Sequence, residues 1–277
     1  MTTSTRPPVH SRPHRCSHDE AGHCPPRRPP IRAAAACLWR YRHTRRDHPP
    51  GHCGEVPEAL AYARSQAGPL SIRSGGRGIS SISTNTGGTV IDLGALATIE
   101  RVGERVVRLG PGMHWGHVAR VLYPWGFAIS SGDSGDVGVG GLATTGGLGL
   151  MGRAHGLTID RLTAADIVTA DGRKLHASAT ENPDLFWAIR GAGANVGIVT
   201  SFAFDASPTP VVAQATIAYQ VRQVASFLQQ WGETVEHAPR EISAFLYVGA
   251  GAAPFAQATV VYAGDGPAPA TRALDRS

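Results

Sequence analysis

Cysteine is scarce in this chain and is absent altogether from most of it. The four cysteines lie at or before Cys53, together with seven of the twelve histidines. No C-x-x-C pair occurs among them, and prolines and arginines surround them. Because paired cysteine spacing is the usual mark of a zinc site or a disulfide framework, we expect neither a metal site nor disulfides in this protein.

Long hydrophobic runs and an excess of basic charge are also missing from the body of the chain. The longest apolar stretch near the start, 33–39, is far shorter than the ~20 residues that a membrane span needs. The formal net charge of +5 comes from residues 1–53, which alone carry +7, so the remainder has a net charge of −2. We therefore expect no membrane span, no nucleic-acid-binding surface and a cytoplasmic protein.

The first 53 residues differ in composition from everything that follows. They hold nine prolines and ten arginines without hydrophobic periodicity, so they have little to bury. We predict that 1–53 is disordered, or is a coding segment read in the wrong frame. Pro208 and Pro210 mark a second boundary, which predicts one domain over 54–207 and another over 208–277.

Hydrophobic periodicity predicts a mixture of helices and strands after residue 54. Asp171-Gly172 between two alternating segments is a strong hairpin signal, and Asn182 before Pro183 is typical of a capped helix start. We expect helices at 55–65, 114–122, 181–190 and 221–237, with a last one starting near residue 267. We expect strands at 70–72, 89–93, 98–102, 106–109, 164–170, 174–178, 196–205, 211–219, 242–248 and 256–262.

Glycine, by contrast, is abundant, and many of the 34 glycines cluster between Gly132 and Gly152. An earlier glycine-rich segment, I-R-S-G-G-R-G at 72–78, directly follows a predicted strand. Successive glycines let backbone N–H groups turn inward around an anion, and a pyrophosphate is the natural guest. An ordinary strand-to-turn connection has the same pattern, so this segment alone does not identify a ligand.

The second glycine-rich segment, 131–149, reads S-G-D-S-G-D-V-G-V-G-G-L-A-T-T-G-G-L-G. It suits an extended loop along a long polar ligand, and the ordered chain on both sides disfavours a low-complexity linker. Gly138 to Ala143 also fits the dinucleotide pattern G-x-G-x-x-A, with Asp160 near the expected acidic position. That motif needs a strand before it and a helix after it, and we predict neither, which disfavours a Rossmann NAD(P)-dependent dehydrogenase.

A third segment, L-F-W-A-I-R-G-A-G-A-N-V-G-I-V-T at 185–200, leads from a helix through a glycine-rich turn into a β-branched strand. In order and spacing, the three segments resemble the berberine-bridge-like branch of the vanillyl-alcohol-oxidase flavoproteins. That family has an R-S-G-G-H-S loop, then V-G-x-G-G-x-x-x-G-G-G-x-G, then N-P-D-L-F-W-A-x-R-G-G-G-G-N-F-G-I-V-T. The resemblance runs from about Val56 to Ala270, and its further points are Gly110-Pro111-Gly112, Trp115, H-G-L-T-I-D at 155–160 and T-A-D-G at 169–172.

The resemblance implies an α+β fold with a PCMH-type FAD-binding domain of two small α+β subdomains. An incomplete α+β substrate domain with an antiparallel sheet would follow. It implies FAD as the cofactor and oxidation of a C–H bond next to an oxygen or nitrogen of a small-molecule substrate, with hydride transfer to the flavin. O2 or another electron acceptor would reoxidise the flavin.

The resemblance leaves the catalytic residues unknown and gives no role to Tyr219, Tyr247 or Tyr262, because the family's catalytic base usually lies in parts beyond residue 277. It assigns cofactor binding to Arg73, Ser74, Gly75, Gly76, Arg77, Gly78, Ser134, Val137, Gly138, Gly140, Gly141, Leu142, Thr145, Gly146, Gly147, Gly149, Gly193, Gly197 and Ile198.

Two positions depart from the family pattern. The family's flavin-tethering histidine falls on Arg77, whose protonated guanidinium is no nucleophile. The cysteine tether of some members falls on Ser134, whose hydroxyl ionises far less readily than a thiol. We therefore predict that FAD is bound noncovalently. Family members also have strands before Val56 and continue past residue 277, so we expect a truncated chain, and a non-catalytic flavin-binding remnant is the alternative to an oxidase.

Overall fold

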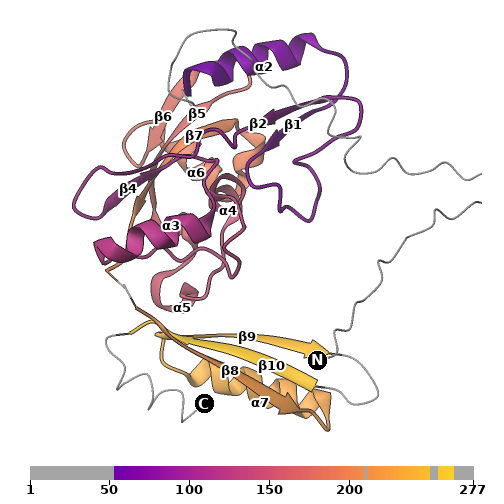
Figure 1. Ribbon diagram of the computed structural model, residues 1–277, viewed down its shortest axis with the longest axis vertical. Coiled ribbons are helices and arrows are strands. Elements are labelled where there is room, and N and C mark those ends of the chain that lie inside the picture. Colours follow the sequence, from indigo (N-terminus) through magenta and orange to yellow (C-terminus); the bar gives the residue numbers. More distant parts are fainter. Residues whose placement is uncertain (1–52, 209–210, 250–254, 265–277) are drawn as a thin grey trace, which may run out of the picture. The chain divides into compact units, whose positions relative to one another are not determined.

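The computed structural model describes residues 53–208, 211–249 and 255–264 (Figure 1). They belong to the second of two compact units, Cys37–Ser277. The predicted disordered segment 1–53 thus lies almost wholly outside the described residues, as does the predicted helix near residue 267. The described strands form three sheets accompanied by helices, which confirms the α+β fold class.

The first sheet is a parallel pair, β1 (Leu70–Arg73) and β2 (Thr89–Asp92). Helix α2 (Val56–Ser65) packs on it, with Pro57 in its first turn, where a missing N–H costs nothing. The buried residues of α2 recur every three or four positions, at Val56, Ala59, Leu60 and Ala63. This spacing puts them on one face of the helix, against β2.

The second sheet has five strands in the order β3-β4-β7-β5-β6, and all neighbours are antiparallel. Its strands are β3 (Ile99–Arg101), β4 (Val106–Leu109), β5 (Leu162–Val168), β6 (Lys174–Ser178) and β7 (Ile198–Asp205). The two predicted hairpins, β3–β4 and β5–β6, are both present. Gly172 supplies the positive φ, +87°, that the second hairpin turn requires.

Helices α3 (Trp115–Leu122), α4 (Val139–Thr145) and α6 (Pro183–Ala192) share the largest core cluster with this sheet. At its centre the rings of Phe202 and Phe204 on β7 stack with centroids 5.9 Å apart, and both side chains are fully buried. Burying an apolar side chain of this size stabilises a fold by roughly 1.5–3 kcal/mol. The shared core therefore holds α4, which carries part of the glycine-rich segment, in a fixed position.

The third sheet is antiparallel, in the order β8-β10-β9, and helix α7 covers one of its faces (Figure 1). Its elements are β8 (Ala213–Gln220), α7 (Val224–His237), β9 (Ile242–Gly249) and β10 (Phe255–Tyr262). Tyr219 and Trp231 meet edge to face in the core between sheet and helix, with ring centroids 6.2 Å apart. The remaining short elements are η2 (Cys53–Glu55), η3 (Tyr123–Trp125), α5 (Gly152–His155), η4 (Thr158–Arg161) and η5 (Gly193–Asn195).

Two local predictions were wrong. The second glycine-rich segment is not extended throughout, because Val139–Thr145 forms helix α4. Each glycine in a helix costs about 1 kcal/mol relative to alanine, but the burial of Val139 and Ala143 on one face of α4 outweighs this weak propensity. Asn182 precedes α6 as expected, yet its side chain does not cap the helix and instead donates from Nδ2 to the His176 carbonyl at 2.6 Å.

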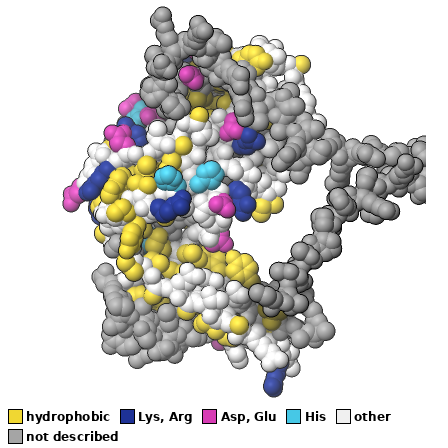
Figure 2. Space-filling model, viewed as in Figure 1, with side chains coloured by type: hydrophobic (Ala, Val, Ile, Leu, Met, Phe, Trp, Pro, Cys, Tyr) yellow, Lys and Arg dark blue, Asp and Glu magenta, His cyan; other side chains and the backbone are white. Residues whose placement is uncertain are grey.

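None of the described helices is long and apolar enough to cross a bilayer. On the face of the molecule drawn in Figure 2, basic side chains stand next to acidic ones rather than forming a basic stripe.

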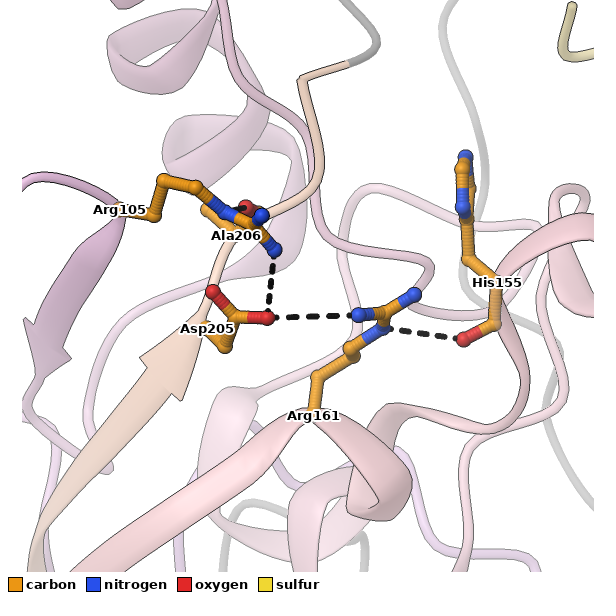
Figure 3. A network of polar contacts seen from close by, with 5 residues as sticks. All are labelled: Arg105, His155, Arg161, Asp205 and Ala206. Atoms are coloured by element: carbon orange, nitrogen blue, oxygen red, sulfur yellow. Dashed lines mark hydrogen bonds and ion pairs between the residues drawn. The ribbon is translucent and has the colours of Figure 1, made fainter.

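Asp205 at the end of β7 joins two arginines from different parts of the chain (Figure 3). Its Oδ2 lies 2.7 Å from Arg105 Nη2 and 3.4 Å from Arg161 Nη1. Arg105 also donates to the Ala206 carbonyl, and Arg161 donates to the His155 carbonyl. The network fixes the end of β7 to η4 and to the end of α5, next to the glycine-rich segment.

The ring of His155 points away from this network (Figure 3). Burial, and then the positive charge of Arg161, lower the pKa of His155 below its ordinary value of 6.5. As the pH falls below 6.5, the unfolded chain takes up this proton before the folded chain does. The stabilisation by neutral His155 is therefore complete above that pH and is lost progressively below it.

We predict that His155→Gln makes the free energy of unfolding fall less steeply with acidification between pH 7 and pH 5. Urea denaturation at each pH measures this slope, whatever the variant's absolute stability. His117→Gln, at an exposed position of α3, is the matched control for the loss of a histidine side chain. A wild-type slope in the His155 variant would contradict the prediction.

Candidate cofactor-binding site

The described part of the chain contains a cavity of about 610 Å³. It lies where four separated segments meet: the chain following β1, the glycine-rich segment with α4, the turn at Pro111, and the start of β7. Its wall is mostly glycine and apolar side chains, with serine and threonine between them. A cavity of this size and character is typical of a cofactor or small-molecule site.

Ser74 ties three of these segments together. Its hydroxyl donates to the Pro111 carbonyl at 2.6 Å and accepts from the Gly140 backbone N–H at 3.2 Å. Ser74 follows β1, Pro111 follows β4, and Gly140 lies in the first turn of α4. One half-buried hydroxyl thus fixes the loop after β1 relative to the glycine-rich helix.

Gly75 and Gly138 bring the same two segments into backbone contact. A Cβ on Gly138 would collide with the Gly75 backbone nitrogen and would lie 2.5 Å from Ser74 Oγ. A Cβ on Gly75 would lie 2.5 Å from the Gly138 nitrogen. Real Cβ atoms do not approach backbone this closely, so the absence of side chains at both positions is what lets the cavity wall close here.

Gly141 differs from these two, because it faces open space. A Cβ there meets nothing within 4 Å, although Gly141 lines the cavity. The nearby Thr144 and Thr145 hydroxyls hydrogen bond back to carbonyls of α4, at 2.9 Å to Gly140 and Gly141 respectively. The hydroxyls of both threonines are thus hydrogen bonded within α4. Gly141 leaves space beside the helix that a ligand can fill.

Fifteen of the nineteen residues predicted to bind the cofactor line this cavity. They are Ser74, Gly75, Gly76, Arg77, Gly78, Val137, Gly138, Gly140, Gly141, Leu142, Thr145, Gly147, Gly193, Gly197 and Ile198. The fold therefore brings together residues more than 100 positions apart in the sequence. Their role in binding FAD stays a prediction.

The other four predicted residues lie outside the cavity wall. Arg73 turns to Asp92 on β2, with Nη2 2.5 Å from Oδ2. Ser134 forms a turn in which its carbonyl accepts from the Val137 N–H. Gly146 ends α4 with a φ of +133°, and Gly149 lies where a Cβ would be 2.7 Å from Ser130 Oγ.

The loop that follows the first glycine-rich motif was not predicted to be part of the site, yet its Ser80, Ile82 and Ser83 line the cavity. Asn85 anchors this loop: its Nδ2 donates to the Thr89 carbonyl at 2.9 Å, and its Oδ1 accepts from the Gly88 N–H at 3.1 Å. The Gly87-Gly88 turn was the sequence feature from which this loop could have been predicted. The remaining lining residues not predicted are Leu70, Ser71, Ile72, Leu93, Pro111, Thr144 and Val199.

The third sheet touches the glycine-rich region at two places. Tyr247 on β9 donates its hydroxyl proton to Asp133 Oδ2 at 3.1 Å, and this hydrogen bond, followed by the Asp133 charge, raises the pKa of Tyr247 above its ordinary value of 10. Arg153 of α5 donates to the carbonyls of Ile242 and Ala238 at 3.0 and 2.9 Å. These contacts place the start of β9 next to α5 and Tyr247 next to the segment that leads into the cavity wall.

Two alternative kinds of site find no support in the described residues. No group of three or more His, Cys, Asp or Glu side chains that could hold a metal occurs in the described ranges. Gly138 to Ala143, which fits the dinucleotide pattern, does begin a helix. No strand precedes it, however, and the neighbouring sheet is antiparallel, so the structure lacks the βαβ unit that a Rossmann site requires.

Residues 49–178 match the family described as FAD binding domain. The chain is 37% identical over 172 residues to (R)-6-hydroxynicotine oxidase of Paenarthrobacter nicotinovorans, a match that covers 60% of this chain and 37% of that protein. It is 50% identical over 106 residues to xylooligosaccharide oxidase of Thermothelomyces thermophilus, covering 38% of this chain and 21% of that protein. The chain thus spans well under half the length of either relative.

Solved structures agree with these matches. The crystal structure of 6-hydroxy-D-nicotine oxidase from Arthrobacter nicotinovorans superposes with a TM-score of 0.75 at 30% identity, covering 91% of this chain and 57% of that one. Chitooligosaccharide oxidase gives a TM-score of 0.73 at 30% identity, covering 82% and 49%. The chain therefore contains an FAD-binding domain. In sequence and fold it resembles FAD-linked oxidases, in agreement with the resemblance that the three glycine-rich segments carry.

We predict that Gly138→Ala lowers the free energy of unfolding by about 1–3 kcal/mol, the usual cost of overpacking, because the new methyl forces Ser74 and Gly75 away. It should also weaken flavin binding, since these segments close the cavity. Gly141→Ala is the matched control: it adds the same methyl three residues further along, inside α4, where space is open, and should keep or raise stability. Urea denaturation measures both, and equal stability of Gly138→Ala and wild type would contradict the prediction.

Proposed function

We propose that the chain binds FAD noncovalently and is part of an oxidase. Its reaction is the oxidation of a C–H bond next to an oxygen or nitrogen of a small organic substrate. The observation that carries the proposal is the glycine-lined cavity, most of whose wall is built by the part of the chain that matches the FAD binding domain family. FAD, when bound, supplies the hydride acceptor, and the protein supplies binding, orientation and exclusion of water.

The residues present suit this cofactor. The segment 74–78 offers successive backbone N–H groups and a positive φ of +67° at Gly76, which suits an anion such as the diphosphate. The apolar wall at Leu142, Ile198 and Val199 suits flat aromatic rings. The open space at Gly141 lets a ligand approach the backbone of α4.

Noncovalent binding follows from the side chains at the two tether positions of the family. Arg77 lines the cavity but has no nucleophilic nitrogen. Ser134 lies outside the cavity wall and carries a hydroxyl in place of a thiol. Among the described residues that line the cavity, none is a histidine or a cysteine.

We predict that acid precipitation of the flavin-loaded protein leaves all of the flavin in the supernatant. The absorbance of supernatant and redissolved pellet measures the distribution. Fluorescence of the protein band on a denaturing gel is an independent control. Yellow, fluorescent pellets would show a covalent bond and contradict the prediction.

The sheet that touches the glycine-rich segment favours a neutral, hydroxylated substrate. No residue of β8, β9 or β10 carries an acidic or basic side chain. On the face away from α7, Gln257 pairs across the strands with Tyr247, and Thr259 pairs with Thr216 and Phe245. Amides, hydroxyls and aromatic rings bind uncharged polar rings well, and the three strands themselves offer no charged side chain to an ionic substrate.

We predict that neutral oligosaccharides or neutral hydroxylated heterocycles bleach the flavin absorbance under anaerobic conditions, whereas carboxylate-bearing analogues do not. Hydrogen peroxide production on admission of air would identify O2 as the acceptor, and reduction of an artificial dye without oxygen consumption would identify another acceptor. Flavin binding without bleaching by any substrate would instead favour a non-catalytic flavin-binding protein.

A further inference from the structure

We propose that Arg77 is the counter-charge for the diphosphate of the bound dinucleotide. This inference rests on the proposed function, because it requires that a flavin dinucleotide occupies the cavity. It assigns to the Arg77 guanidinium a binding role that compensates for the missing covalent tether.

Arg77 is the one ionisable side chain among the residues that line the cavity. All the other lining residues are glycine, proline, serine, threonine or aliphatic. A dinucleotide diphosphate carries two negative charges, and burying them in such a wall without a cation is costly. The composition of the wall therefore singles out Arg77 as the available partner for that charge.

Arg77 is also uncommitted within the described residues, where its side chain takes part in no hydrogen bond or ion pair. The contrast with Arg73 is direct, since Arg73 lies in the same segment but is held by Asp92 through two hydrogen bonds to Oδ2. Two arginines four positions apart thus have different roles. Arg73 links β1 to β2, and Arg77 is exposed at the cavity.

The chemistry of the guanidinium suits this task. Its planar fork of N–H donors matches two phosphate oxygens at once. Arg77 stands between Gly76 and Gly78, so the side-chain charge and the backbone N–H groups of the segment reach the same small region. Because Arg77 is exposed, solvent screens part of the attraction, and the effect on affinity is moderate.

The test compares three flavins and three variants by quenching of flavin fluorescence at low and high salt. FAD carries the diphosphate, FMN carries one phosphate, and riboflavin carries none. Arg77→Gln should weaken FAD binding about ten- to hundredfold, as expected for loss of a charged hydrogen bond, and should leave riboflavin binding unchanged. Arg77→Lys should retain more affinity, because it keeps the charge but loses the fork.

Arg120→Gln, on the exposed side of α3 and away from the cavity, removes the same charge and should bind all three flavins as wild type does. Salt should weaken FAD binding to wild type more than to Arg77→Gln, because salt screens the ion pair between Arg77 and the diphosphate, which the variant lacks. ADP should displace FAD from wild type at lower concentration than adenosine does, and this difference should shrink in Arg77→Gln.

Unchanged FAD affinity and salt dependence in Arg77→Gln would overturn the inference and leave the proposed function intact. An equal loss of FAD and riboflavin binding in that variant would also overturn it, because such a loss indicates a structural role. Absence of FAD binding by wild type itself would instead contradict the proposed function. Circular dichroism of each variant separates loss of the fold from loss of the charge, and Arg77→Lys keeps the test valid if Arg77→Gln does not fold.

Discussion

The close approach of the Gly75 and Gly138 backbones is the constraint on which the candidate site depends. A Cβ on either glycine would collide with the other segment, and the Ser74 hydroxyl links both to Pro111. The loop after β1 and helix α4 therefore form one wall of the cavity although more than 60 residues separate them. The large core around Phe202 and Phe204 supports this wall, because it buries the opposite side of α4. The glycines let α4 lie close to the loop after β1, and the packed core on the other side of α4 holds the helix in place.

This construction explains why the cavity is almost without charge. Glycine segments bind ligands through backbone N–H groups, which need close approach and no side chain. Arg77 supplies the single ionisable group, and the polar threonines of α4 satisfy their own helix. A cofactor with an anionic centre and flat rings fits such a wall. The proposed noncovalent binding and the proposed role of Arg77 are two consequences of the same residue.

The third sheet meets the glycine-rich region through few but well-defined contacts. Arg153 binds two carbonyls at the start of β9 and before it, and Tyr247 binds Asp133 directly before Ser134. The strands of this sheet carry no acidic or basic side chain, so the proposed substrate recognition there rests on amides, hydroxyls and aromatic rings. Charged side chains meet elsewhere in the described chain, where Asp205 binds both Arg105 and Arg161.

Most elements, the β5–β6 hairpin at Asp171-Gly172 and the resemblance to FAD-linked oxidases could be predicted from the sequence alone, because periodicity, turn residues and glycine spacing are local signals. That resemblance predicted fifteen residues of the cavity wall. The helix at Val139–Thr145 could not be predicted in this way, since burial of one face in the folded chain overrides its poor helix propensity. Only the tertiary structure likewise distinguished Arg73 from Arg77. Both lie in the first glycine-rich segment, and the difference lies in Asp92, a partner that the chain brings to Arg73 by pairing β2 with β1.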